Sequence, residues 1–382
     1  MKTLTLIVLL NCMINLSFAQ WIHIPAGMEN KYIYSMAVNG NNIFAGTSSN
    51  GVYLSENNGT SWSNTSLNNR VIQALYVDNN TVYAGTSEHG IYYTTNNGSN
   101  WTQTSLNNKT IYSITVKDNV LYAGTDSSGV FYSTNNGADW EQTSFPNYSV
   151  YSLTTAGGVL IAGTSENGVF LSTDGGNSWI PTNLFNRAVF CFDSTGNKIF
   201  AGTSQGIYES TNFGFNWTQT TFNEEITSSM VINENLFFAG TFSGGVYVSV
   251  DSGMTWNQWN EGLTQLTASA LLILNNFIYN GTQNSVFRRP VGELTGTGMI
   301  LNEVPERFSL SQNYPNPFNP STKINWTTSK FSKQTLKVYD ILGNEIAVLI
   351  DEEKPAGRFE LTFDASNLSS GIYFYKLQTG DF

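Results

Sequence analysis

Residue types that carry metal, redox or nucleic-acid chemistry are scarce in this chain of 382 residues. It contains two histidines and two cysteines, and only 12% of its residues are charged. His23 and His89 are too few and too far apart in sequence to indicate a metal site. The formal net charge of −11 argues against a general nucleic-acid binder, which needs clustered Lys and Arg to neutralise phosphates. We therefore expect no cofactor, no metal and no nucleic-acid partner.

The chain also lacks any long apolar run after residue 19, so we expect no membrane-spanning segment in the mature protein. Before that point, Lys2 precedes an apolar stretch over 4–16, and small residues precede Gln20. This pattern is typical of a secretory signal peptide that is cleaved before Gln20. A lipoprotein signal at Cys12 is the weaker alternative, because its neighbour is an Asn. Cleavage leaves Cys191 as the single cysteine, which excludes an intramolecular disulfide.

One tripeptide recurs seven times along the chain, and its spacing is nearly constant. The copies are Ala45-Gly46-Thr47, Ala84-Gly85-Thr86, Ala123-Gly124-Thr125, Ala162-Gly163-Thr164, Ala201-Gly202-Thr203, Ala239-Gly240-Thr241 and the degenerate Asn280-Gly281-Thr282. The steps of 39, 39, 39, 39, 38 and 41 residues match the period of one four-stranded propeller blade. The repeat therefore predicts a closed ring of seven blades.

Each repeat has the composition of β-strands. In the second repeat, runs rich in aromatic and β-branched residues cover 71–77, 81–86, 90–95 and 101–105, and Asn, Gly and Ser separate them. The pattern predicts four strands for each blade.

An eight-residue signature follows the third predicted strand in six repeats. It resembles the Asp-box, or sialidase-type, repeat Ser-x-Asp-x-Gly-x-x-Trp of sortilin-like and photosystem II stability factor-like propellers. Its Asn or Asp side chain can bond backbone amides just ahead, Gly takes the positive φ and Trp fills the seam, so Asn and Asp are expected to be interchangeable. The expected structural positions are Asn57, Gly59, Trp62, Asn96, Gly98, Trp101, Asn135, Gly137, Trp140, Asp174, Gly176, Trp179, Asn212, Gly214, Trp217, Asp251, Gly253 and Trp256.

The seventh repeat has no such signature, because Asn280-Gly281-Thr282 leads only to Arg288-Arg289-Pro290. Trp21 lies 41 residues before Trp62 and so falls on the repeat register. We expect the N-terminus to supply the missing outer strand of the last blade, which would leave no half-finished blade exposed.

The end of the chain carries a second set of motifs. They are the string Asn313-Tyr314-Pro315-Asn316-Pro317-Phe318-Asn319-Pro320, the segment Leu336–Gly343 and the segment Leu368–Leu377. This set resembles the C-terminal sorting domain of proteins exported by the type IX secretion system of Bacteroidetes-like bacteria. The resemblance implies a small immunoglobulin-like sandwich that the outer-membrane translocon reads.

Together these patterns predict an all-β chain, a seven-bladed β-propeller followed by a small immunoglobulin-like β-sandwich. The expected parts are a signal peptide (1–19), the propeller (20–290), a linker (291–306) and the sorting domain (307–382). Members of the sorting family usually continue through a further strand, so we expect the sequence to be truncated at Phe382. The expected export partner is the type IX translocon, and the expected location is secreted or on the outer-membrane cell surface.

The candidate ligand site is the channel mouth, where loops from strand four to the next strand one meet loops from strand two to strand three. The position 14 residues before each tripeptide falls in the first kind of loop and reads Lys31, Arg70, Lys109, Tyr148, Arg187, Glu225 and Leu266. Four of the eight propeller bases occupy this register, which would bind anionic groups such as the carboxylates of an acidic glycan. The competing interpretation is ion pairing between loops, with Glu88, Asp126 and Glu166 as partners.

Signatures of catalysis are weak. Sialidases with this repeat use three arginines and an Arg-Ile-Pro motif near the start, whereas Arg288-Arg289-Pro290 lies at the other end. Xyloglucan-cleaving relatives need a carboxylate pair across a cleft, for which Asp126 and Glu166 are the nominal candidates. We expect a non-catalytic binding or interaction module for an extracellular glycan or protein. A glycoside hydrolase or sialidase-like enzyme is the alternative, and an assembly factor that binds protein partners is a third class.

Overall fold

The computed structural model describes residues 20–223, 225–294, 309–314, 316–318, 320–328, 332–354, 357–366, 368–369 and 371–379. The expected signal peptide lies outside the described residues. The chain divides into two compact units, Met1–Leu272 with Tyr279–Arg289, and Ile273–Ile278 with Pro290–Phe382. None of the described residues forms a helix long and apolar enough to span a membrane.

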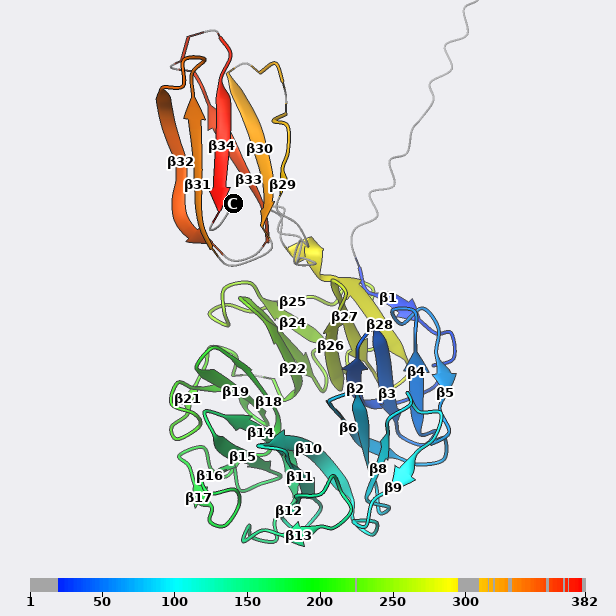
Figure 1. The fold of residues 1–382 in the computed structure, drawn as a ribbon. Coiled ribbons are helices and arrows are strands. Elements are labelled where there is room, and N and C mark those ends of the chain that lie inside the picture. Colours follow the sequence, from blue (N-terminus) through cyan, green and yellow to red (C-terminus); the bar gives the residue numbers. More distant parts are fainter. Residues whose placement is uncertain are drawn as a thin grey trace, which may run out of the picture. The chain divides into compact units, whose positions relative to one another are not determined.

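Seven four-stranded antiparallel sheets correspond to the seven repeats, which confirms the predicted propeller (Figure 1). Blade one contains β2 (Ile33–Asn39), β3 (Asn42–Thr47), β4 (Val52–Ser55) and β5 (Ser63–Asn64). Blade two contains β6 (Ile72–Asp78), β7 (Thr81–Thr86), β8 (Ile91–Thr94) and β9 (Thr102–Gln103). Blade three contains β10 (Ile111–Lys117), β11 (Val120–Thr125), β12 (Val130–Ser133) and β13 (Glu141–Gln142). Blade four contains β14 (Val150–Ala156), β15 (Val159–Thr164), β16 (Val169–Ser172) and β17 (Ile180–Pro181). Blade five contains β18 (Val189–Thr195), β19 (Lys198–Thr203), β20 (Gly206–Ser210) and β21 (Thr218–Gln219). Blade six contains β22 (Thr227–Asn233), β23 (Leu236–Thr241), β24 (Val246–Ser249) and β25 (Asn257–Gln258). The first strand of each blade lies nearest the centre of the ring (Figure 1).

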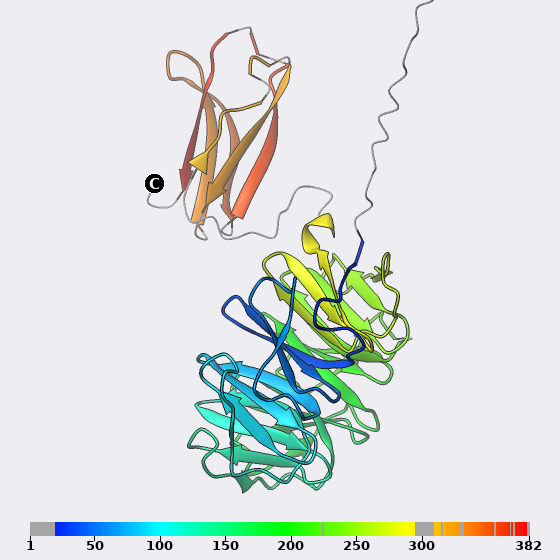
Figure 2. The same cartoon turned by 90° about the vertical axis from the view of Figure 1, so that its right-hand side faces the viewer.

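The last blade closes the ring with both ends of the propeller sequence. It contains β26 (Ala270–Leu274), β27 (Phe277–Gly281), β28 (Val286–Pro290) and, as its outer strand, β1 (Ile22–Ile24). Ile22 pairs with Arg288, and the dark blue start of the chain runs beside the yellow last blade (Figure 2). The predicted N-terminal closure is therefore confirmed.

The middle glycine of each tripeptide sets how closely neighbouring blades pack. A Cβ atom on Gly46 would lie 2.6 Å from Ile72 Cγ2 of the next blade, and a Cβ on Gly281 would lie 2.7 Å from Ile33 Cγ2. At all seven copies the hypothetical Cβ comes within 2.8 Å of an atom in the following blade. Real side chains do not tolerate such distances, so only glycine permits this approach.

The six signature turns share one hydrogen-bond pattern. The Ser or Thr hydroxyl accepts the N–H of the glycine at 2.7–3.0 Å, and the Asn or Asp Oδ1 accepts the N–H four residues ahead at 2.9–3.0 Å. The Ser178 hydroxyl and N–H lower the pKa of Asp174 to about 2, and the Thr255 N–H and hydroxyl do the same for Asp251. The turn chemistry expected from the sequence is present.

The C-terminal unit is a β-sandwich. One three-stranded sheet contains β29 (Ser309–Leu310), β30 (Ser321–Thr328) and β33 (Gly357–Asp364), and the other contains β32 (Glu345–Lys354), β31 (Ser332–Tyr339) and β34 (Phe374–Thr379). Side chains of both sheets, including Trp326 and Leu336, share one buried core. The first four residues of the expected linker form the 3₁₀ helix η1 (Val291–Leu294), and residues 295–306 lie outside the described part.

The first prediction concerns closure of the ring. Trp21 is 2% exposed, its Nε1 donates to the Trp259 carbonyl at 2.5 Å, and the Arg289 guanidinium lies 4.1 Å from the Trp259 ring. Trp21→Ala in the mature chain should lower the free energy of unfolding by about 3–5 kcal/mol, as for other buried aromatic side chains. Ile22→Ala is the matched control, because the Ile22 side chain is 49% exposed. Equal denaturant midpoints for the two variants would show that this contact does not hold the ring closed.

The second prediction concerns the signature turns, where the structure corrects the expected interchangeability of Asn and Asp. Asn57 Nδ2 donates to the Ser61 hydroxyl at 2.8 Å, but Asn135 Nδ2 donates to the Asp139 carboxylate at 2.9 Å. Asn57→Asp should be tolerated, because the Ser61 hydroxyl can donate as Ser178 does to Asp174. Asn135→Asp should destabilise the protein, because it places two carboxylates together.

Thermal unfolding of the two variants across pH measures this difference. A carboxyl with a folded pKa of about 2, as at Asp174, and an unfolded pKa of about 3.9 stabilises the fold above about pH 4. That stabilisation is lost as the pH falls towards 2, and Asn57→Asp should follow this course. Equal melting points for Asn57→Asp and Asn135→Asp at pH 7 would contradict the role given to Asp139.

Candidate binding face at the channel mouth

The predicted register residues hold neighbouring loops together through their backbone. Five of the seven register carbonyls accept an N–H from a glycine in the strand-two-to-three loop of the preceding blade. The pairs are Gly51–Arg70, Gly90–Lys109, Gly129–Tyr148, Gly168–Arg187 and Gly245–Leu266, with N···O distances of 2.8–3.1 Å. Because these hydrogen bonds between loops use backbone atoms only, the side chain at this position can differ from blade to blade.

Three cations of the register lie over aromatic rings of their own blades. Lys31 Nζ is 5.5 Å from the ring of Tyr53, Lys109 Nζ is 5.9 Å from Phe131, and Arg187 Cζ is 5.2 Å from Tyr208. These rings belong to the third strands β4, β12 and β20, two strands out from the first strand. Tyr148 follows the same pattern, since its ring lies 6.0 Å from that of Phe170 in β16. The structure therefore brings these residues to one face but holds each against its own blade.

The two other candidates have polar neighbours. Arg70 Nη1 donates to the Asn69 carbonyl at 3.3 Å, and its buried Nε has no hydrogen-bond partner. Glu225 Oε1 accepts a long hydrogen bond of 3.4 Å from the Tyr247 hydroxyl.

The expected ion pairs between loops do not form among the described residues. Neither Glu88, Asp126 nor Glu166 makes a salt bridge with a register cation there. Asp126 Oδ1 instead accepts the Ser149 hydroxyl of the adjoining loop at 2.7 Å. A hydroxyl hydrogen bond can satisfy this carboxylate without a cation, which is why the charge pattern alone was misleading.

The sequence analysis missed a second repeated position, 11 residues before each tripeptide. In six blades the register of the first strand shifts at this point, so one residue is left out of the ladder as a β-bulge. The bulged residues are Tyr34, Gln73, Tyr112, Tyr151, Phe190 and Ser228. Alignment of the repeats shows four aromatics at this register, which is the signal that could have revealed it.

Bulged rings from three consecutive blades form a row, here called the aromatic row, which Phe242 extends. The ring centroids of Tyr112 and Tyr151 are 5.0 Å apart, those of Tyr151 and Phe190 5.9 Å, and those of Phe190 and Phe242 5.5 Å. Burial raises the pKa of Tyr112 and of Tyr151, and the charge on Asp126 raises both further. Both phenols therefore stay protonated as hydrogen-bond donors.

Exposed apolar side chains also occur in the loops of this face, and the exposed Phe242 forms one end of the row. They come from the same two kinds of loop in blades four to seven, and they are Tyr148 (37% exposed), Phe185 (60%), Ile226 (41%), Phe242 (41%) and Leu266 (46%). The Phe242 N–H donates to the Ile226 carbonyl at 3.3 Å, which ties two of these loops together. Exposed apolar side chains that lie together, as Phe242 and Ile226 do, are typical of an interaction surface.

The part of the chain that the structure describes holds no group of three His, Cys, Asp or Glu side chains that could ligate a metal. Asp126 and Glu166 lie in the strand-two-to-three loops of blades three and four, so both carboxylates belong to this face.

Two family models match parts of the chain. Residues 312–382 match the secretion system C-terminal sorting domain, and residues 96–188 match the DUF6242 beta propeller domain. The protein is thus a β-propeller that carries a C-terminal secretion-system sorting domain, and it is secreted or held at the outer-membrane surface. A search of curated proteins finds no match.

Similar solved structures are propellers of different activities. The extracellular domain of BT4673 from B. thetaiotaomicron has 18% identity and a TM-score of 0.61, with 81% of this chain and 46% of that one covered. The Niastella koreensis GH74 enzyme has 15% identity and a TM-score of 0.58, with 81% and 59% covered. YCF48 from Cyanidioschyzon merolae, a protein also solved bound to D1 peptide, has 14% identity and a TM-score of 0.55, with 71% and 98% covered.

At these identities the likeness shows the fold alone. The chain spans less than two thirds of the BT4673 domain and of the GH74 enzyme.

Proposed function

We propose that the propeller, residues 20–290, is a non-catalytic module that binds an apolar segment of another extracellular protein. The sorting domain, residues 307–382, delivers it outside through the type IX translocon. The observation that carries this proposal is the aromatic row together with the exposed apolar side chains in the loops of the same face. Because the sorting domain delivers the propeller to the cell surface, the propeller meets its extracellular partner there.

The chemistry of the exposed side chains favours a protein over a glycan. Aromatic rings can stack on sugars or on protein side chains, but the aliphatic Ile226 and Leu266 have no such use in holding a sugar. Apolar and aromatic side chains at the centre of a surface are typical of protein interfaces. The fold shared with YCF48, which has been solved bound to D1 peptide, is compatible with peptide binding.

In this proposal the charged register residues Lys31, Arg70, Lys109, Arg187 and Glu225 belong to the polar rim of the face, and Tyr148 belongs to its apolar part. Lys31, Lys109 and Arg187 lie over rings of the third strands, outward from the first strands, and Glu225 adds a charge of the opposite sign. Rim charges that stay in contact with water orient a partner and affect its association rate more than its affinity.

A glycoside hydrolase remains the second candidate, because Asp126 and Glu166 lie on this face and the GH74 enzyme has a similar fold. Glycoside hydrolysis needs one carboxylate as the acid and another as base or nucleophile, placed on opposite sides of the bond. Asp126 is held by two hydroxyls, those of Ser149 and Ser127. An assay for sugar release from polysaccharide tests this candidate directly.

The third prediction tests the binding face with a matched pair of variants. Phe242 and Phe215 are both 41% exposed, but Phe215 lies in a turn between strands three and four, at the opposite end of its blade. Peptides selected from a phage-displayed library on the mature chain should be rich in apolar residues. Phe242→Ser should weaken their binding by about tenfold, the loss of roughly 1.4 kcal/mol for an interface contact, and Phe215→Ser should leave it unchanged.

A glycan array probed with the same three proteins separates the alternatives. Peptides that bind Phe242→Ser as tightly as the parent would refute the proposed face. Glycans that bind the parent and are lost with Phe242→Ser would replace the protein partner by a sugar. Release of reducing sugar by the parent would replace binding by catalysis.

A further inference from the structure

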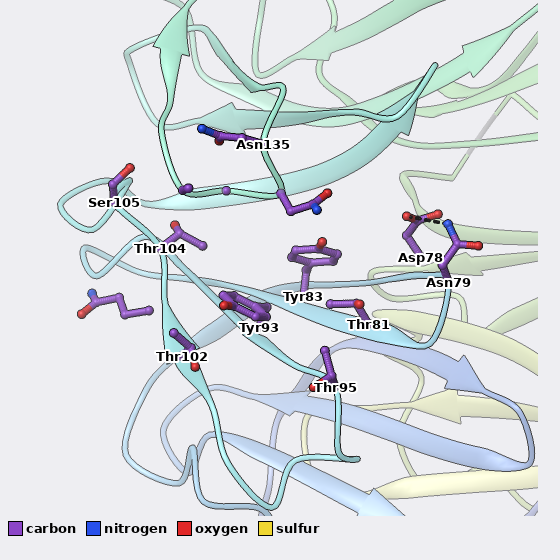
Figure 3. A pocket seen from close by; sticks show the side chains of 14 residues that line it. Asp78, Asn79, Thr81, Tyr83, Tyr93, Thr95, Thr102, Thr104, Ser105 and Asn135 are labelled. Carbon is purple, nitrogen blue, oxygen red and sulfur yellow. Dashed lines mark hydrogen bonds between the residues drawn. The ribbon is translucent and has the colours of Figure 1, made fainter.

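A pocket of about 540 Å³ lies at the seam between blades two and three. Its walls come from the turn after β6, from β7, β8 and β9, and from the signature turn of blade three (Figure 3). Turns between strands one and two, and between strands three and four, lie at one end of a four-stranded meander. The pocket, here called the seam pocket, is therefore on the face opposite the channel mouth.

One hydroxyl in the seam pocket lacks the hydrogen bond that its equivalents make. Three blades have a tyrosine immediately before the tripeptide, namely Tyr83, Tyr122 and Tyr279. The Tyr122 hydroxyl donates to the Gly175 carbonyl at 3.2 Å, and the Tyr279 hydroxyl donates to the Asn58 carbonyl at 2.9 Å. Both carbonyls belong to the residue that follows the Asn or Asp of the next signature turn.

Tyr83 is only 4% exposed, yet its hydroxyl makes no hydrogen bond with any described residue. The equivalent residue of the next turn, Asn136, lies on the pocket wall instead. Figure 3 shows Tyr83 beside Tyr93 and Thr81 on one wall, with Asn135 on the other. The Tyr83 hydroxyl keeps contact with solvent in the pocket, so a bound group can hydrogen-bond to it in place of water.

A second polar atom on the same wall is also without its usual partner. Thr65 and Thr143 each donate from Oγ1 to a carbonyl of strand three at 3.0 Å. The equivalent Thr104 is 6% exposed, and its Oγ1 has no hydrogen-bond partner. Two repeated contacts are thus missing at one seam, but Thr104 Oγ1 is fully buried, so only the Tyr83 hydroxyl can meet a ligand in the pocket.

The lining specifies the chemistry of a ligand. It contains no Lys, Arg or His and one acid, Asp78, so it does not favour an anion. The Asn136 amide, the amide oxygens of Asn79 and Gln103, and the hydroxyls of the Thr, Ser and Tyr residues offer both donors and acceptors, whereas the Asn135 amide is engaged within its own turn. The rings of Tyr83 and Tyr93, with centroids 6.2 Å apart, provide an apolar surface. A ligand with hydroxyl groups around a ring that has an apolar face matches this combination of polar groups and aromatic surface.

We propose that the seam pocket binds a neutral sugar unit of an extracellular glycan. The half-buried Tyr93 ring stacks on the sugar, and the Tyr83 hydroxyl and the surrounding amides bond to its hydroxyls. Its size falls in the range of small-ligand sites, about 300–1,000 Å³. The corresponding position at the next seam is occupied, because Tyr122 bonds across it and Tyr132 donates to Glu141 at 2.6 Å. Of the three seams that have a tyrosine before the tripeptide, the seam between blades two and three is the one where no cross-seam hydrogen bond of this tyrosine forms among the described residues.

The fourth prediction uses the mature full chain and two single-atom variants. Cellobiose, maltose, xylobiose and mannobiose are titrated by calorimetry, with glucuronic acid as the charged control. At least one neutral disaccharide should bind. Tyr83→Phe should raise its Kd by about three- to tenfold, the effect of losing one neutral hydrogen bond, without lowering the melting temperature. Tyr122→Phe should lower the melting temperature and leave the Kd unchanged.

Three results would overturn this proposal. They are the absence of binding by every neutral sugar, equal Kd values for the parent and Tyr83→Phe, and tighter binding of glucuronic acid. The test is independent of the proposed protein partner, because Tyr83→Phe lies on the face opposite Phe242 and should leave peptide binding unaffected.

Discussion

The close approach of neighbouring blades at the tripeptide glycines is the constraint on which the rest of the structure depends. At Gly124, for example, an added Cβ would lie 2.4 Å from Ser113 Oγ and 2.8 Å from Val150 Cγ1 of the next blade. Without side chains at these seven positions, the first strand of one blade packs against the second strand of the blade before it. Gly281 repeats the contact against Ile33, so the same packing closes the ring.

This packing also positions the binding face. In six blades the bulge lies at the point where the first strand begins, next to the loops that meet at the channel mouth. The 39-residue period therefore places residues of equal register in equivalent positions around the ring. Tyr112, Tyr151 and Phe190 become neighbours although 39 residues separate each from the next. A surface of this kind can change its ligand by substitution at one register without altering the packing of the blades.

The sequence predicted what depends on period and turn chemistry. Blade number, closure by the segment at Trp21 and the signature turns all follow from spacing, because each uses the same backbone geometry in every repeat. Side-chain direction could not be predicted in this way. Lys109 could point to a neighbouring loop or to Phe131, and Tyr83 and Tyr122 are the same residue at the same register with different partners. Such differences arise from contacts between repeats, which spacing alone does not contain.

The central claim is that the propeller binds its partner through the aromatic row. Hydrogen–deuterium exchange of the mature chain, with and without a selected apolar peptide, tests it most directly. Exchange is measured at backbone amides, and these include the amides of the bulged residues. We expect slower exchange at the starts of β10, β14 and β18 and in the loop that carries Phe242. Protection confined to the outer strands β13, β17 and β21, or to the C-terminal sandwich, would contradict this account.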